Sequence, residues 1–161
     1  MINYIKGDAT RPQGEGPKII THCCNDEGRW GRGFVKALTR RWPDTENAYR
    51  LWFRTGRMLN GKVQAIGKFT LGSVQFIEVE PELWVANLIG QHGVRRANNK
   101  APIRYEAIQN GLLKVNLQAR LYDASIHMPR MGAGLAGGDW SRIEEIISKE
   151  IQVPVTVYDL E

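Results

Sequence analysis

The stretch KIITHCCNDEGRWGRG, residues 18–33, decides how this chain folds. It begins with an apolar run typical of a buried strand and ends in a glycine-rich segment, Gly28 to Gly33, directly before a helical pattern. Glycine adopts positive φ without steric cost, so main-chain N–H groups in such a loop can closely approach an anion. The helix that follows points the positive end of its dipole at the same place.

A second stretch, residues 124–138, repeats this arrangement. The apolar run ASIHMP is followed by a loop in which Gly132, Gly134, Gly137 and Gly138 stand close together. The spacing of the first three formally matches a dinucleotide-binding fingerprint, but it comes too late in the chain for a Rossmann domain. Two loops of this type in one short chain instead predict a site that holds a diphosphate from both sides.

The remaining periodicity predicts an α/β protein, because apolar strand-like segments alternate with helical ones. We expect strands at 2–6, 18–23, 65–79, 83–90, 124–128 and 153–158, and helices at 33–41, 44–58, 103–120 and 141–150. Gly72-Ser73 is a candidate interruption of the third strand, and Glu80-Pro81-Glu82 indicates an antiparallel hairpin. In such sheets ligands lie beyond the carboxyl ends of the strands, where both glycine loops fall.

Composition places the chain among ordinary globular proteins. Its 161 residues suit one domain, 1–161, and no apolar run approaches the roughly 20 residues that cross a membrane. The start, Met1 to Lys6, lacks the apolar core of a signal peptide, so we expect a cytoplasmic protein, and we expect a monomer.

The adjacent Cys23 and Cys24 are unsuited to a mutual disulfide, and we expect both to be reduced. A net charge of +5 and a pI of about 9.4 favour phosphorylated or polyanionic partners.

Several segments together resemble the macro domain family of ADP-ribose-binding modules. They follow the family's order and span nearly the whole chain: Gly7-Asp8-Ala9-Thr10, His22-Cys23-Cys24-Asn25 with residues 28–33, Asn87-Leu88-Ile89-Gly90-Gln91, residues 128–134, and Thr156-Val157-Tyr158-Asp159-Leu160. The subgroup that these patterns resemble most contains the ADP-ribose-1''-phosphate phosphatases and the glutamate-linked ADP-ribosyl-hydrolases. The resemblance implies a three-layer α/β/α fold with a mixed, mostly parallel central sheet.

The resemblance also implies how ADP-ribose would lie. Asp8 would accept a hydrogen bond from the adenine amino group, and Tyr158 would pack beside adenine, although a turn residue and a core residue are the structural alternatives. Main-chain amides of the two glycine loops would hold the diphosphate. The full set of implied ligand-binding residues is Asp8, Ala9, Gly31, Arg32, Gly33, Gln91, Arg130, Gly132, Ala133, Gly134, Leu135, Ala136 and Tyr158.

His22, Asn25 and Asp139 are the candidate catalytic residues. The resemblance places His22 and Asn25 at the distal ribose, where a histidine could move a proton or accept a phosphoryl group, with Asp139 as its partner. The alternatives are a hydrogen-bonded core histidine and an aspartate that caps a helix. Gln91 and Ala136 stand where the glutamate-linked hydrolases have a lysine and an aspartate, which argues against a covalent lysine mechanism.

Three functions remain open from the sequence. The first is a hydrolase that removes a phosphate, a protein or a nucleobase from the distal ribose of ADP-ribose, assisted by histidine or by the substrate's own diphosphate. The second is a module that reads ADP-ribose without turnover. The third is a nucleic-acid-binding domain, which the charge favours although no helix-turn-helix or zinc-finger pattern is present. We expect neither a cofactor nor a metal, because the three histidines and the carboxylates lack a ligand spacing.

Overall fold

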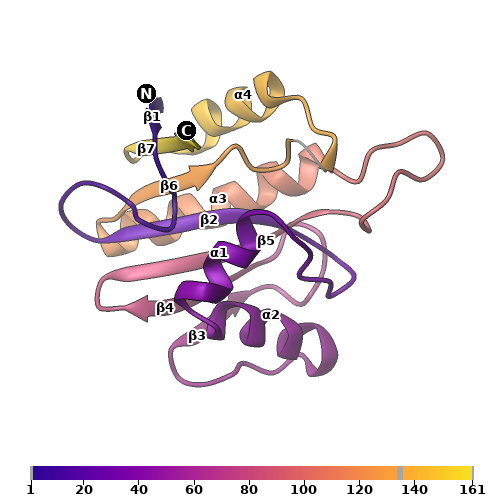
Figure 1. The fold of residues 1–161 in the computed structure, drawn as a ribbon, viewed down its shortest axis with the longest axis horizontal. Coiled ribbons are helices and arrows are strands. Elements are labelled where there is room, and N and C mark those ends of the chain that lie inside the picture. Colours follow the sequence, from indigo (N-terminus) through magenta and orange to yellow (C-terminus); the bar gives the residue numbers. More distant parts are fainter. Residues whose placement is uncertain (1, 134–135, 161) are drawn as a thin grey trace.

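The fold follows the predicted alternation of strands and helices (Figure 1). The computed structural model describes residues 2–133 and 136–160. Within these residues the elements are β1 (Ile2–Lys6), β2 (Lys18–Asn25), α1 (Phe34–Arg41), α2 (Asp44–Thr55), β3 (Val63–Ile66), β4 (Val74–Glu80), β5 (Leu83–Gln91), α3 (Tyr105–Tyr122), β6 (Ser125–Pro129), α4 (Trp140–Glu150) and β7 (Val155–Asp159).

The strands form one mixed sheet in the order β1-β7-β6-β2-β5-β4-β3. The pairs from β1 through β5 are parallel, whereas β4 pairs with β5, and β3 with β4, in antiparallel orientation. The mixed, mostly parallel sheet is therefore confirmed, as is the antiparallel hairpin around Glu80 to Glu82. The parallel strands β2 and β5 lie side by side, so both carry their last residues to the same edge.

Helices cover both faces of the sheet. Successive side chains of a strand point to opposite faces, so on β2 Ile19 packs with α3 and α4, and Ile20 packs with α1 and α2. Leu112 of α3 and Leu38 of α1 are fully buried on their respective sides. In Figure 1, α1 and α2 lie on the viewer's side of the sheet. Because both faces are buried, the central strands are mostly apolar, and the three-layer prediction is confirmed.

The segment expected at 65–79 forms two strands, and the candidate interruption at Gly72-Ser73 lies in the connection between them. β3 ends at Ile66, and β4 begins at Val74 and runs back beside it. The connection favours a glycine at 67, since the backbone there has a φ of 97° and a Cβ at this position would lie 2.3 Å from Ser73 Oγ. The apolar residues on both sides of this turn gave one continuous sequence pattern, which concealed the reversal.

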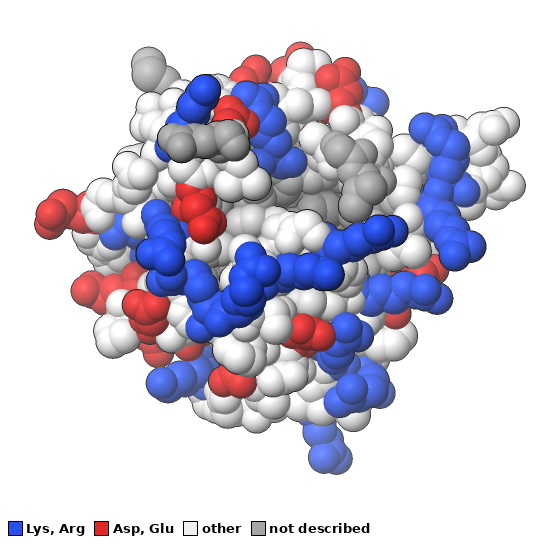
Figure 2. All heavy atoms as spheres, viewed as in Figure 1, with Lys and Arg blue, Asp and Glu red and all other residues white. Residues whose placement is uncertain are grey.

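Charge is distributed unevenly over the surface. Figure 2 shows Lys and Arg side chains forming a nearly continuous band across the face on which α1 lies in Figure 1. Acidic side chains are interspersed elsewhere on this face. None of the helices in the described residues has the length and apolar character needed to cross a membrane.

Candidate functional site

A cleft of about 430 Å³ opens at the carboxyl ends of β2 and β5. Its walls come from the end of β2, the β2–α1 loop, the first helical turn and the segment after β5: Cys23, Cys24, Asn25, Arg29, Trp30, Gly31, Arg32, Val35, Gln91, Val94 and Arg95. Asn25 and Gln91 are register partners on the two neighbouring strands. The fold thus brings four of the predicted site residues, Asn25, Gly31, Arg32 and Gln91, to one hollow.

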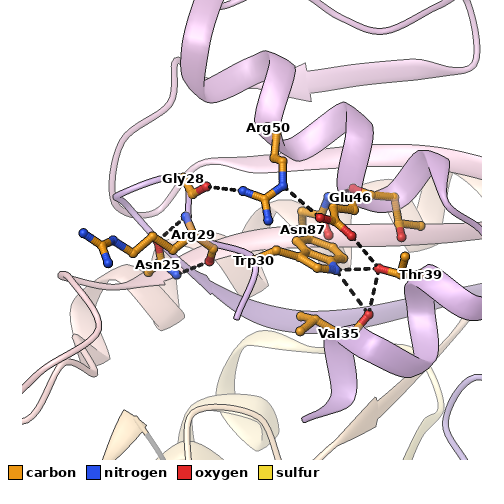
Figure 3. A network of polar contacts seen from close by, with 10 residues as sticks. Asn25, Gly28, Arg29, Trp30, Val35, Thr39, Glu46, Arg50 and Asn87 are labelled. Atoms are coloured by element: carbon orange, nitrogen blue, oxygen red, sulfur yellow. Dashed lines mark hydrogen bonds and ion pairs between the residues drawn. The ribbon is translucent and has the colours of Figure 1, made fainter. Parts of the chain in front are cut away.

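Asn25 shapes the loop that forms one wall of this cleft. Its Oδ1 accepts hydrogen bonds from the main-chain N–H groups of Glu27, at 2.9 Å, and Arg29, at 3.1 Å (Figure 3). Its Nδ2 donates to the carbonyl oxygen of Arg29, and the hydroxyl of Tyr49 donates to the main-chain carbonyl oxygen of Asn25 at 2.6 Å and lies 3.0 Å from Oδ1. Both polar ends of Asn25 are therefore used within the protein, an arrangement that suits a residue positioning the loop.

A second set of hydrogen bonds ties the loop to both neighbouring helices (Figure 3). The indole Nε1 of Trp30 donates to Thr39 Oγ1 at 2.7 Å, and the Thr39 hydroxyl donates to Glu46 of α2 at 2.9 Å. Arg50 donates to Glu46 at 2.8 Å and to the carbonyl oxygen of Gly28 at 3.3 Å. A loop fixed in this way loses little conformational freedom when it binds a ligand.

The loop presents open main-chain groups beside the cleft. Gly31 and Gly33 have φ values of 80° and 86°, and no heavy atom lies within 4 Å of a Cβ built at either position. Gly33 precedes α1 without a side-chain cap, and the first turn of α1 holds no acidic residue. The positive end of the α1 dipole is therefore uncompensated by the helix's own side chains at this point. These features are those of an anion-binding loop.

The second glycine loop folds back on itself between β6 and α4. The N–H of Gly138 donates to the carbonyl oxygen of Gly132 at 2.9 Å, and the carbonyl oxygen of Ala136 accepts from Ile103 at 3.1 Å. Ala136 is buried and Ala133 is half-buried. Gly134 and Leu135, which are predicted to contact the diphosphate, lie outside the described residues.

Asp8 sits in a tight turn after β1. Its Oδ1 accepts from both the main-chain N–H and the hydroxyl of Thr10, each at 2.8 Å, and Ala9 and Thr10 are buried. The turn alternative is thus realised, but it engages one carboxylate oxygen. Within the described residues Oδ2 makes no hydrogen bond, so it could accept one from a ligand.

Tyr158 and Arg130 are engaged by other residues of the chain. The Tyr158 side chain is 3% exposed, and its hydroxyl accepts from Gln13 N at 2.8 Å and lies 2.7 Å from His127 Nδ1. This phenol anchors the segment between β1 and β2. Arg130 forms a two-pronged ion pair with Asp159, at 2.6 and 3.0 Å. Neither side chain lines the cleft at β2 and β5.

His22 is a core residue, 2% exposed. Its Nε2 lies 2.5 Å from Asn87 Oδ1, while Asn87 Nδ2 donates to Gln75 Oε1 at 3.1 Å, so the Nε2 of His22 carries the proton. Burial lowers the pKa of this imidazole to about 4. The expectation that His22 faces a substrate therefore lacks geometric support, and the core alternative describes its surroundings.

Asp139 caps α4. Its Oδ1 accepts from the main-chain N–H of Ser141 at 3.0 Å and from the Ser141 hydroxyl at 2.8 Å. Its side chain makes no contact with His22 among the described hydrogen bonds and ion pairs. The expected pairing of these two residues is wrong because each side chain is committed to its own element, a central strand for His22 and a helix start for Asp139.

His92 and Asp26 form a pair that the sequence alone did not suggest. His92 Nδ1 lies 2.7 Å from Asp26 Oδ2, and Asp26 Oδ1 accepts from Gly93 N at 2.8 Å. The imidazole is 61% exposed and lines a hollow of about 340 Å³ that shares Arg29, Val94 and Arg95 with the main cleft. The sequence signal that could have found this pair is adjacency to predicted site residues, because Asp26 follows Asn25 and His92 follows Gln91.

The two cysteines are free and stand in the cleft wall. Burial raises the pKa of the Cys23 thiol to about 12 and raises that of Cys24 as well, so neither is a ready nucleophile. In the described part of the chain, no three His, Cys, Asp or Glu side chains are grouped to hold a metal ion.

Comparison with known proteins places this fold and sequence in a family, although no family model matches the chain. The structure of a macrodomain protein from Streptomyces coelicolor is 49% identical, covers 99% of both chains and superposes with a TM-score of 0.83. The mouse chromodomain-helicase-DNA-binding protein 1-like is 33% identical over 98% of this chain, which spans only 17% of the mouse protein. The ADP-ribose 1''-phosphate phosphatase of Candida albicans is 26% identical, over 98% of this chain and 99% of that protein. The chain belongs to the macro domain family.

Proposed function

We propose that this chain binds ADP-ribose at the carboxyl edge of the sheet. The observation that carries the proposal is the rigid β2–α1 loop, whose open glycines and helix dipole face the cleft that contains Gln91. The diphosphate would lie on this loop, the distal ribose beside Asn25 and Gln91, and adenine near Asp8. The ADP-ribose 1''-phosphate phosphatase of C. albicans, to which this chain is similar along nearly its whole length, supports this ligand.

Asp8→Asn tests the adenine end of this proposal. Asparagine keeps an oxygen for the Thr10 turn but replaces Oδ2 with a donor, which cannot accept from the adenine amino group. A hydrogen bond to a charged group is worth about 1.5–3 kcal/mol, so ADP-ribose should bind about 10- to 100-fold more weakly. Calorimetry measures the affinity. Thermal unfolding of both proteins verifies that the turn is intact, and unchanged affinity would remove Asp8 from the site.

We further propose that the protein hydrolyses a bond at the distal ribose, with His92 moving the proton. Water supplies the new oxygen as the bond to the 1'' substituent breaks. The imidazole takes a proton from this water and returns a proton to the leaving oxygen. Asp26 holds Nδ1 of the imidazole and leaves Nε2 for this task, an acid–base arrangement with an orienting carboxylate. The exposed imidazole and its hollow next to the cleft support this role.

His92→Gln should lower turnover of ADP-ribose-1''-phosphate or of ADP-ribosylated acceptors about 100-fold, in the range usual for one acid–base group. ADP-ribose affinity should stay within twofold of wild type. Asp26→Asn should also lower turnover, and adding it to His92→Gln should cost little more, since the two residues act as one unit. Full activity in His92→Gln would remove this residue from the mechanism.

A reader of ADP-ribose without turnover is the second candidate. It is favoured by a specific observation: His22, Asn25 and Asp139, the residues first expected to catalyse, are all engaged in internal hydrogen bonds. The same assays separate the candidates. Binding with no release of ADP-ribose from any of these substrates would establish the reader.

A further inference from the structure

The positive charge of this chain is concentrated on the two sides of the cleft. One side, the α1 rim, is residues 28–43, and the other, the arm rim, is residues 92–104. Together they hold nine of the 22 Lys and Arg residues and none of the 17 Asp and Glu residues. The rest of the chain, with 13 basic and 17 acidic residues, carries a net charge of −4. Both rims contribute arginines to the cleft wall, Arg29 and Arg32 from one and Arg95 from the other.

Most cations of the α1 rim lack an acidic or hydrogen-bonding partner, and the guanidinium of Arg41 lies over the Trp42 ring, 4.9 Å from its centroid. Among the described residues, the side chains of Arg32, Lys36, Arg40 and Arg41 form neither an ion pair nor a hydrogen bond. All four are exposed. Lys36 and Arg40 stand four residues apart on one face of α1, where like charges repel and weaken the helix slightly. Among the described residues, no acidic side chain pairs with Lys36 or Arg40 to offset this repulsion. The arrangement therefore suits an anionic partner.

The arm rim projects from the body as a tight hairpin, seen at the right of Figure 1. Ala97 and Lys100 exchange main-chain hydrogen bonds at 3.0 and 2.9 Å, and Asn98 and Asn99 turn the chain with φ values of 50° and 61°. Figure 2 shows basic side chains on this projection as well as along the α1 band. The cleft therefore opens between two basic surfaces.

We propose that the two rims bind the sugar-phosphate backbone of a nucleic acid, laid across the mouth of the cleft. The two linked phosphates of a single ADP-ribose carry far fewer negative charges than the nine positive charges of the rims. Lys36 and Arg40 are separated by about 6 Å along α1, close to the distance between neighbouring phosphates of one DNA strand. Arginine also matches phosphate oxygens with paired N–H donors.

The chemistry of the α1 rim favours this partner over a membrane. Of the exposed large apolar side chains in the described residues, none belongs to 28–43 and one, Val94, belongs to the arm rim, so the two rims offer little to insert into lipid. The α1 rim also lacks an exposed aromatic ring for base stacking. Binding therefore depends on backbone charge and is independent of sequence. This inference stands apart from the proposed ADP-ribose function, because it needs no ADP-ribose on the nucleic acid.

Anisotropy with a fluorescein-labelled 20-base-pair DNA duplex of arbitrary sequence, at several salt concentrations, tests the proposal. Lys36→Gln/Arg40→Gln should weaken binding at least tenfold at low salt and lower the slope of log affinity against log salt by about 2. The matched control, Arg120→Gln/Lys149→Gln, removes the same charge from α3 and α4 and should bind like wild type. ADP-ribose affinity should be unchanged in both variants, so a failure here and a failure of the proposed function are distinguishable.

Three results would overturn the proposal. The first is an absence of saturable DNA binding at low salt. The second is equal weakening by both double variants, which would assign any binding to net charge. The third is tighter binding, with the same dependence on Lys36 and Arg40, to polyglutamate or to vesicles containing phosphatidylserine. That outcome would mean that the rims bind an acidic protein segment or a membrane and not a nucleic acid.

Discussion

Replacing Gly31 by glutamate is expected to abolish measurable ADP-ribose binding, with a loss of about 1,000-fold or more. Three effects act together. The side chain enters the cleft, because Gly31 lines it and the space beside its Cα is open. The new carboxylate repels the diphosphate, by about 4 kcal/mol for two charges 4 Å apart near a protein surface. A φ of 80° also costs a residue with a side chain about 1–2 kcal/mol.

The matched control for this variant is Gly56→Glu. Gly56 ends α2 with a φ of 75°, and no heavy atom lies within 4 Å of a Cβ at this position, so the backbone strain is comparable while the site is untouched. Calorimetry with ADP-ribose and urea unfolding are run on both proteins. Equal stability of the two variants with binding lost only in Gly31→Glu is the expected pattern. Near-normal binding by Gly31→Glu would mean that the diphosphate does not lie on this loop.

Acidification is expected to destabilise the native state by about 4 kcal/mol between pH 7.5 and pH 5, through His22 and His127. Burial holds the pKa of each near 4, against 6.5 for an ordinary imidazole. Each ring acts as a neutral hydrogen-bonding group: His22 toward Asn87, and His127 between Ser125 and Tyr158. The unfolded chain therefore binds more protons over this range, so stability is full above pH 6.5 and falls toward pH 4.

Urea unfolding at a series of pH values measures this dependence. His127→Gln should remove about half of it, because one of the two buried imidazoles is then absent. Because a buried substitution can fail to fold, NMR titration of the imidazole protons in the wild-type protein gives an independent readout. Titration of both buried rings near pH 6.5, or a stability curve that is flat from pH 7.5 to 5, would contradict the prediction.

Local sequence predicted most of the fold because each element carries its own signal. Apolar runs such as residues 18–23 mark strands buried on both faces, and glycine clusters mark the loops that leave them. The segment predicted at 65–79 was resolved only in part, for a physical reason: the chain reverses between β3 and β4 near Gly67, which has a φ of 97°, while the apolar pattern continues on both sides. A periodicity argument cannot detect such a reversal.

The site was predictable in its location and only partly in its chemistry. Chain order placed Asn25, Gly31 and Gln91 at strand ends that the fold brings together. The role of a polar side chain depends on partners distant in sequence, and local sequence patterns do not identify those partners. His22 faces Asn87, which is 65 residues away, and Asp26 meets His92, which is 66 residues away. For the same reason, the tie between Tyr158 and Gln13 emerged only from the structure.

A calorimetric titration of the wild-type protein with ADP-ribose, with AMP and ribose 5-phosphate as comparison ligands, is the decisive measurement. We expect one saturable site of micromolar affinity, about −8 kcal/mol, and much weaker binding of either fragment, since each reaches only one side of the diphosphate loop. Absence of heat and of thermal stabilisation by ADP-ribose at millimolar concentration would contradict the assignment of this cleft.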